Sequence, residues 1–81
     1  MEQGKIIGFQ GSWGSGLGYL VLEGGIAIPC DNGATVRALD ACFGGVITDT
    51  HTVNNDAIRG KEIVYETDWL GLLEWFAPRE D

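Results

Sequence analysis

Hydrophobic residues first appear along the chain in short runs that are typical of β-strands. Residues 6–9 form one such run, and residues 19–23 form a second that stops at a Gly-Gly pair. A Gly-Gly pair between two apolar runs favours a hairpin, because the central positions of a tight turn need positive φ angles. Residues 26–28 form a third short strand, which Pro29 either ends or places at a sheet edge.

The hydrophobic period then changes to that of a helix. Three apolar residues between positions 36 and 43 are spaced three and four apart, so they share one face of a helix. Asp31 or Asn32 is a suitable N-cap, and Gly44 stands where a C-cap glycine belongs. We therefore predict a helix of about three turns after the third strand.

Two more strands are expected after a stretch with no clear period. Residues 46–48 allow a short strand, and residues 54–56 favour a turn. Acidic and apolar residues then alternate over 61–68, which is typical of a half-buried strand. A turn at 68–71 follows, and the run "LLEWFAP" returns as a second strand that Pro78 ends.

The order strand, strand, strand, helix, strand, strand suggests a fold. Short strands with glycine-rich corners suit a small barrel, since closure removes exposed edges. We expect a mainly β (α+β) fold: a small five-stranded OB-like barrel with one helix between strands 3 and 4, in a single domain of residues 1–81. Five early glycines are expected to let the first two strands bend: Gly8, Gly11, Gly14, Gly16 and Gly18.

Two short motifs, "GKIIGF" at 4–9 and "GLGYL" at 16–20, open the chain. Together they resemble the start of cold-shock domains, which are nucleic-acid-binding OB-folds. In that family Gly-Lys begins an alternating run that ends in Phe, and a motif of alternating glycines and aromatic residues follows on the second strand. The resemblance covers about the first 22 residues. It implies a small β-barrel.

This resemblance does not extend to the family's stacking aromatic residues. Gly8 stands where the family has an aromatic residue, and Leu17 stands between two glycines where it has another. The stretch "IAIPCDN" has no match to the third-strand motif with its aromatic residue and His. The resemblance therefore implies the barrel without the family's stacking surface.

Charge narrows the classes of partner. Twelve Asp and Glu against five Lys and Arg give a formal net charge of −7. Such a field repels a polyanion, so nucleic-acid binding is possible but disfavoured, whereas a basic protein surface is attracted. The chain has neither an apolar stretch of bilayer length nor a basic, apolar leader. We therefore expect no membrane association and a cytoplasmic location.

Catalytic and cofactor motifs find little support. The glycine-rich stretch 11–18 lacks the Gly-Lys-Ser/Thr of a phosphate loop and leads into a strand, which also excludes the dinucleotide fingerprint. Cys30, Cys42 and His51 have the spacing C-x11-C-x8-H, which matches no paired spacing of zinc sites. The two cysteines are expected to be small buried hydrophobes. Nothing places a nucleophile beside His51, so we expect no enzyme activity, no metal and no cofactor.

Aromatic residues in loops are the best binding candidates. Trp13, flanked by glycines, either folds back onto the barrel or contacts a partner. Trp69 and Leu70 lie in the turn between the last two strands, and this loop and the first one flank the usual ligand face of an OB barrel. With Tyr19 these residues are able to form one aromatic patch. The alternative is that Trp69 and Trp75 complete a small core.

Arg59 and Lys61 straddle a glycine just before the fourth strand. They either hold a phosphate or carboxylate, or pair with Asp56 or Glu62. The pairing is the more common outcome for exposed charges.

The sequence predicts a small acidic, non-catalytic binding module whose partner is another protein or a second copy of itself, met through the loops of Trp13 and Trp69. One alternative is a single-stranded nucleic-acid-binding OB-fold protein that uses Trp13, Tyr19, Arg59 and Lys61. A further alternative is an acidic inhibitor that mimics a nucleic-acid backbone, with its carboxylates arrayed along one face.

Overall fold

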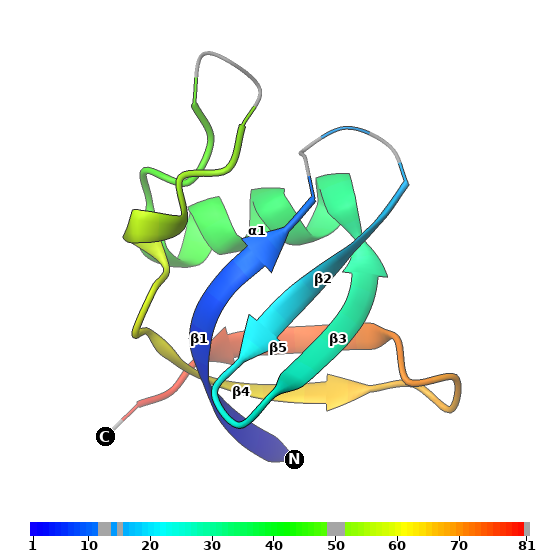
Figure 1. The fold of residues 1–81 in the computed structure, drawn as a ribbon. Coiled ribbons are helices and arrows are strands. Elements are labelled where there is room, and N and C mark those ends of the chain that lie inside the picture. Colours follow the sequence, from blue (N-terminus) through cyan, green and yellow to red (C-terminus); the bar gives the residue numbers. More distant parts are fainter. Residues whose placement is uncertain (12–13, 15, 49–51, 81) are drawn as a thin grey trace.

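A computed structural model describes residues 1–80 apart from 12–13, 15 and 49–51. It contains five antiparallel strands with one α-helix between the third and the fourth (Figure 1), which confirms the mainly β fold class. The elements are β1 (Glu2–Gln10), β2 (Leu17–Leu22), β3 (Ile26–Asp31), α1 (Asn32–Phe43), the short 3-10 helix η1 (Asn55–Ala57), β4 (Glu62–Thr67) and β5 (Leu73–Pro78).

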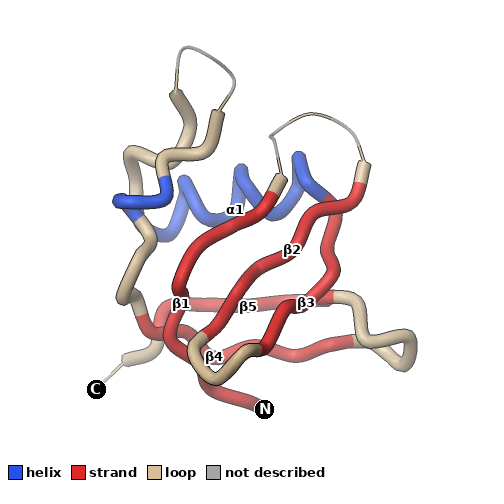
Figure 2. The backbone as a smooth tube through the Cα atoms, in the orientation of Figure 1, coloured by secondary structure: helices blue, strands red, loops and turns tan. Residues whose placement is uncertain are grey.

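The five strands form one sheet in the order β3-β2-β1-β4-β5. Strand β1 belongs to both halves of this sheet, because residues 2–5 pair with β4 and residues 6–10 pair with β2. A register shift between Ile6 and Gly8 marks the change. As a result β2 and β3 cross in front of β4 and β5 (Figures 1 and 2). The edge strands β3 and β5 approach each other without pairing, so the sheet is barrel-like with an open seam.

The core lies between the two halves of the sheet and α1. Its buried members come from every named strand except β5, from α1 and from the segment that follows it: Ile6, Phe9, Leu20, Leu22, Ile28, Cys30, Val36, Leu39, Val46, Ile58, Ile63 and Tyr65. Cys30 is buried, as predicted, but Cys42 is exposed on α1, which corrects the expectation of two buried cysteines. Both thiols are free.

Helix α1 has the caps that its sequence predicts. The carboxylate of Asp31 accepts a hydrogen bond from the Ala34 N–H at 2.9 Å. At the other end Gly44 has a φ of 74° and its N–H donates to the carbonyl of Asp40 at 2.8 Å. The Asp31 carboxylate already interacts with the N-terminal end of α1, so this end does not need a bound anion.

Two of the early glycines, Gly11 and Gly18, make room for a side chain. A Cβ on Gly18 would collide with the side chain of Asn32 and would lie 2.7 Å from the carbonyl oxygen of Gln10. A Cβ on Gly11 would collide with Asn32 too. Asn32 is the first residue of α1 and is only 5% exposed. These two glycines therefore let β1 and β2 pack closely against the start of α1, whereas Gly8, at the register shift, fits the predicted role in bending.

Strand β3 continues through Pro29 to Asp31. Proline has no amide hydrogen to donate to a neighbouring strand, so within a sheet it is tolerated at an edge, and β3 is an edge strand. Of the two alternatives that the sequence left open for Pro29, the edge position is therefore the one observed.

The segment between α1 and β4 packs along the part of the β1 edge that does not pair with β4. The side-chain oxygen of Asn55 in η1 accepts a hydrogen bond from the Phe9 N–H at 2.7 Å. The Gly60 N–H donates to the carbonyl of Ile6, also at 2.7 Å. Nearby, Ile47 and Val53 form an isolated bridge. Among the described residues, no helix has the length and apolarity that crossing a membrane requires.

Candidate functional site

The predicted site residues that the structure describes are exposed and lie on two surfaces. Tyr19 is 44% exposed on the outer side of β2, and Arg59 lies close to that side. Trp69 stands at the tip of the β4–β5 turn, which projects away from β2 in Figure 1. Trp13 lies outside the described residues, as does His51.

The first surface is the outer face of β1 and β2. Tyr19 pairs across the strands with Gln10, and a shallow hollow of about 160 Å³ extends from Gln10 over Ile7 and Val21 to Arg59. The Arg59 guanidinium forms an ion pair with Asp56, the pairing that the sequence analysis favoured. Both side chains are exposed, so water screens this pair.

Lys61 is exposed as well, and its backbone joins the η1 segment to β1. Its carbonyl accepts a hydrogen bond from the Ile6 N–H at 2.8 Å, and its N–H donates to the carbonyl of Ile58 at 3.1 Å. The main chain of Lys61 therefore has a structural role.

The second surface begins at the β4–β5 turn, where Trp69 is 90% exposed. The carboxylate of Asp68 holds this turn by accepting hydrogen bonds from the Leu70 N–H at 2.9 Å and the Leu72 N–H at 3.0 Å. Gly71 closes the turn with a φ of 85°, and its N–H donates to the Asp68 carbonyl. The alternative in which Trp69 and Trp75 complete the core is therefore wrong, because Trp69 lies in solvent at the tip of the turn and Trp75 is also exposed.

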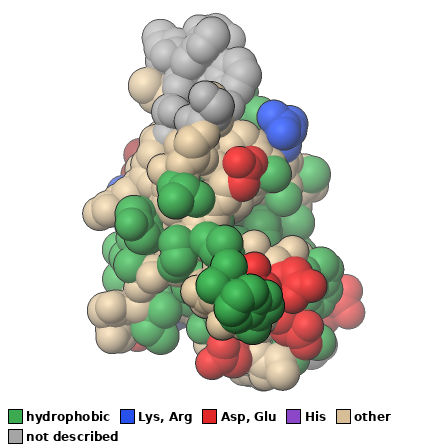
Figure 3. Space-filling view, turned by 90° about the vertical axis from the view of Figure 1, so that its right-hand side faces the viewer, with side chains coloured by type: hydrophobic (Ala, Val, Ile, Leu, Met, Phe, Trp, Pro, Cys, Tyr) green, Lys and Arg blue, Asp and Glu red, His purple; other side chains and the backbone are tan. Residues whose placement is uncertain are grey.

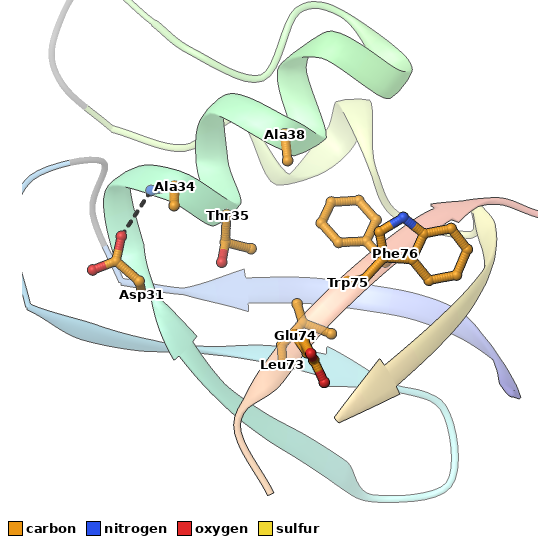
Figure 4. Close-up of a pocket in the computed structure, with 8 residues that line it drawn as sticks. All are labelled: Asp31, Ala34, Thr35, Ala38, Leu73, Glu74, Trp75 and Phe76. Carbon is orange, nitrogen blue, oxygen red and sulfur yellow. Dashed lines mark hydrogen bonds between the residues drawn. The ribbon is translucent and has the colours of Figure 1, made fainter. Parts of the chain in front are cut away.

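A groove of about 220 Å³ continues this surface along β5, between that strand and α1. Figure 4 shows residues of α1 and its cap on one wall and residues of β5 on the other. The lining residues are Asp31, Ala34, Thr35, Ala38, Leu73, Glu74, Trp75 and Phe76. Leu73 and Phe76 also pack against the core, while Trp75 is 45% exposed. No residue of β4 lines the groove, so it lies on the side of β5 away from β4.

The groove was not predicted from the sequence. One signal was present: Ala34 and Ala38 are four residues apart and therefore share a face of the predicted helix, one that carries no large side chain. What that face looks onto depends on how α1 packs against β5. Periodicity does not contain that information.

Acidic side chains surround the hydrophobic ones on this second surface. Glu66, Asp68 and Glu74 lie on the same hairpin as Trp69, and Glu66 pairs across the strands with Trp75. Figure 3, which faces the side of the molecule where the β4–β5 turn projects, shows acidic and hydrophobic side chains gathered together in its lower part. We call the set Glu66, Asp68, Trp69, Leu70, Glu74 and Trp75 the hairpin surface.

The two cysteine thiols have low reactivity. Burial raises the pKa of the Cys30 thiol, although a hydrogen bond with the side chain of Thr35 acts in the opposite direction. Partial burial also raises the pKa of Cys42. Both thiols are therefore protonated near neutral pH and are weak nucleophiles. Within the described part of the chain, no cluster of three or more His, Cys, Asp or Glu side chains is suitable for a metal ion.

The chain matches no family model, no curated protein and no solved structure. The function is therefore inferred from the geometry of the two surfaces.

Proposed function

We propose that this protein is a small acidic, non-catalytic module that binds a protein partner through the hairpin surface. The observation that supports this most strongly is the 90% exposure of Trp69 on a turn that Asp68 holds in place. A tryptophan in water is unfavourable, and burial of its indole in an interface recovers the hydrophobic free energy. Tryptophan is also among the residues that most often dominate the binding energy of protein interfaces.

The charge of the hairpin surface indicates the kind of partner. Three carboxylates accompany its exposed apolar side chains, and the whole chain carries a net charge of −7. Opposite charge on the partner increases the rate of association and selects against acidic competitors. The partner is therefore a protein with a basic surface that also offers an apolar pocket for Trp69.

Strand order supports a place among small OB-like barrels. The order β3-β2-β1-β4-β5, with α1 between β3 and β4 and with β3 close to β5, is compatible with a barrel of that type. In OB-folds the loop between strands 4 and 5 is one of those that contact the ligand. Trp69 occupies that loop here, which is consistent with its proposed role as the anchor of the interface.

The experiment compares Trp69→Ala with Ile26→Ala, a control that removes another exposed apolar side chain, 43% exposed, at the start of β3. Each tagged variant is used to capture proteins from the cells that produce it, with quantitative mass spectrometry as the readout. Loss of a hot-spot tryptophan costs about 2 kcal/mol, a roughly thirtyfold weakening. The same proteins should therefore be retained by the wild type and Ile26→Ala but not by Trp69→Ala. Identical retention by all three overturns the proposal.

A second candidate function, single-stranded nucleic-acid binding, is favoured by one observation. Tyr19 and Arg59 border the same outer face of β1 and β2, so a base is able to stack near a guanidinium. The competing ion pair with Asp56 and the net charge of −7 weaken this candidate. Fluorescence anisotropy of a labelled ten-nucleotide oligothymidine at low salt tests it. An absence of binding at high micromolar protein eliminates it, and binding that Tyr19→Ala abolishes supports it.

A further inference from the structure

The two edge strands of the sheet differ in their ability to accept another strand. An unpaired edge offers a row of N–H and C=O groups, and proline is one of the residues that protect such edges. Strand β3 carries Pro29 at an interior position. Strand β5 has its proline only at its last residue, Pro78, so residues 73–77 all have amide hydrogens, and those of alternate residues face away from β4. Of the two edges, β5 is therefore the one suited to strand addition.

The groove places residues 73–76 of this edge beside α1, although β3 also approaches β5 without pairing with it. Residues 73–76 line one side of the groove. On the other side, Ala34 and Ala38 have only methyl groups and therefore leave space between α1 and β5. Among the residues on the β5 side, Leu73 and Phe76 are apolar and pack against the core. A groove between an edge strand and a helix is a recurring way to hold an extended peptide, in which main-chain hydrogen bonds give affinity and side-chain pockets give specificity.

The charges of the groove select a basic peptide over a second copy of this chain. Asp31 stands on the α1 side and Glu74 on the β5 side, whereas Arg37 of α1 does not line the groove. Pairing of two β5 edges would bring together two strands that each carry Glu74 and have no basic residue of their own to balance it. With a net charge of −7 on each chain, self-association of this kind is disfavoured.

We propose that the groove between α1 and β5 binds an extended segment of the partner protein, in which apolar and basic residues alternate. The segment adds as a strand to β5, its apolar side chains enter the groove, and its Lys or Arg side chains approach Asp31 and Glu74. The bulge at Glu74 and the proline at the end of β5 keep the added strand short. This inference rests on the proposed function and names the partner's element.

The first test uses a defined probe, the peptide acetyl-KVKVKVKV-amide, titrated into the isotope-labelled protein. Binding should slow hydrogen exchange at the amides of β5 and leave those of β3 unchanged. A second peptide has the same side chains, but its backbone is N-methylated at alternate residues, which removes the N–H donors of one edge and blocks the close approach of that edge to β5. It should bind about tenfold more weakly, because its main-chain hydrogen bonds to β5 are lost. An absence of binding by the first peptide at millimolar concentration overturns the proposal, as does equal binding by the two.

Two pairs of variants connect the probe to the groove. Ala38→Phe fills the groove, and its control Ala41→Phe adds the same ring to an exposed position of α1 that does not line it. Glu74→Lys reverses a charge in the groove, and Glu23→Lys makes the same change after β2, outside the groove. Ala38→Phe and Glu74→Lys should each weaken peptide binding about tenfold, and each control by less than about twofold. Equal effects within a pair overturn the proposal.

The partner-capture experiment separates this inference from the proposed function. If Trp69→Ala releases the captured proteins while Ala38→Phe retains them, the groove proposal is overturned and the proposed function stands. If both variants release them and Ala41→Phe does not, both proposals are supported. If sedimentation shows a dimer that Ala38→Phe dissociates, a second copy occupies the groove, and the proposal of a basic partner segment is overturned.

Discussion

The β1–β2–β3 half of the sheet and the β4–β5 hairpin use their residues differently. In the first half, inward side chains such as Leu20 are fully buried, and glycines such as Gly18 allow contacts that no other residue permits. The hairpin instead holds Trp69 and Leu70 in solvent on a turn bonded by Asp68. The difference suggests that the first half supplies most of the stability, while the hairpin retains exposed apolar surface for binding. Four predictions test this division, from the largest expected effect to the smallest.

Truncation of a leucine should lower stability strongly in the first region and hardly at all in the second. Leu20 is 0% exposed, so Leu20→Ala leaves a cavity and should lower the free energy of unfolding by about 3 kcal/mol. Leu70 is 61% exposed, so Leu70→Ala should change it by less than about 0.5 kcal/mol. Urea unfolding followed by tryptophan fluorescence measures both. A large loss of stability in Leu70→Ala would show that the hairpin tip is part of the stabilising structure, contrary to this comparison.

Glycine substitutions separate close packing from backbone strain. A Cβ at position 18 would meet the Asn32 side chain and the Gln10 carbonyl, so Gly18→Ala should destabilise the fold by about 2 kcal/mol. Gly25 has a φ of 78° but open space around it, so Gly25→Ala should cost only about 1 kcal/mol of left-handed strain. Thermal unfolding of the two variants gives the comparison. If the two losses are equal, the contact between β2 and the start of α1 is unimportant.

The buried thiol predicts how stability depends on pH. Burial raises the pKa of Cys30 in the folded protein above its value in the unfolded chain. The unfolded thiol therefore releases its proton first as pH rises above about 8.5, and stability falls across the interval up to the raised pKa. Urea unfolding between pH 7 and 10 should show this decline. Cys30→Ala should flatten it and Cys42→Ala, at an exposed position, much less; an unchanged slope in Cys30→Ala would refute the assignment.

The smallest effect is expected at the β4–β5 turn itself. Asp68→Ala removes two hydrogen bonds to backbone amides in an exposed turn, which should lower stability by about 0.5 kcal/mol. Amide hydrogen exchange at Leu70 and Leu72 should become faster, while exchange in β2 stays the same. Glu66→Ala serves as the control, since it removes a carboxylate of the hairpin surface without touching these bonds. Equal exchange in the two variants would mean that Asp68 does not hold the tip.

Several elements were predictable because the interactions that form them are local. The caps of α1 at Asp31 and Gly44 bond to residues three and four positions away, so spacing along the chain was enough to identify them. The β4–β5 hairpin was visible in the alternation of acidic and apolar residues, and its turn in the stretch 68–71. The same local pattern placed Trp69 in a turn but did not decide between the core and solvent.

Other features depend on residues that are distant in sequence. The edge position of Pro29 follows from which strands pair, and the contact of Gly18 with Asn32 follows from where α1 begins relative to β2. The groove needs Ala38 of α1 and Trp75 of β5 on facing walls, although 36 residues separate them. No local pattern reports such a distance, because packing of the whole core sets it.

The amino-acid sequence by itself therefore determined the order of the elements, the capped helix, the turns and the acidic charge, all of which arise from neighbouring residues and composition. Only the tertiary structure decided that the sheet divides along β1, that Trp69 remains in solvent and that α1 and β5 line a groove. These outcomes depend on which apolar faces bury one another, a choice that the whole chain makes together.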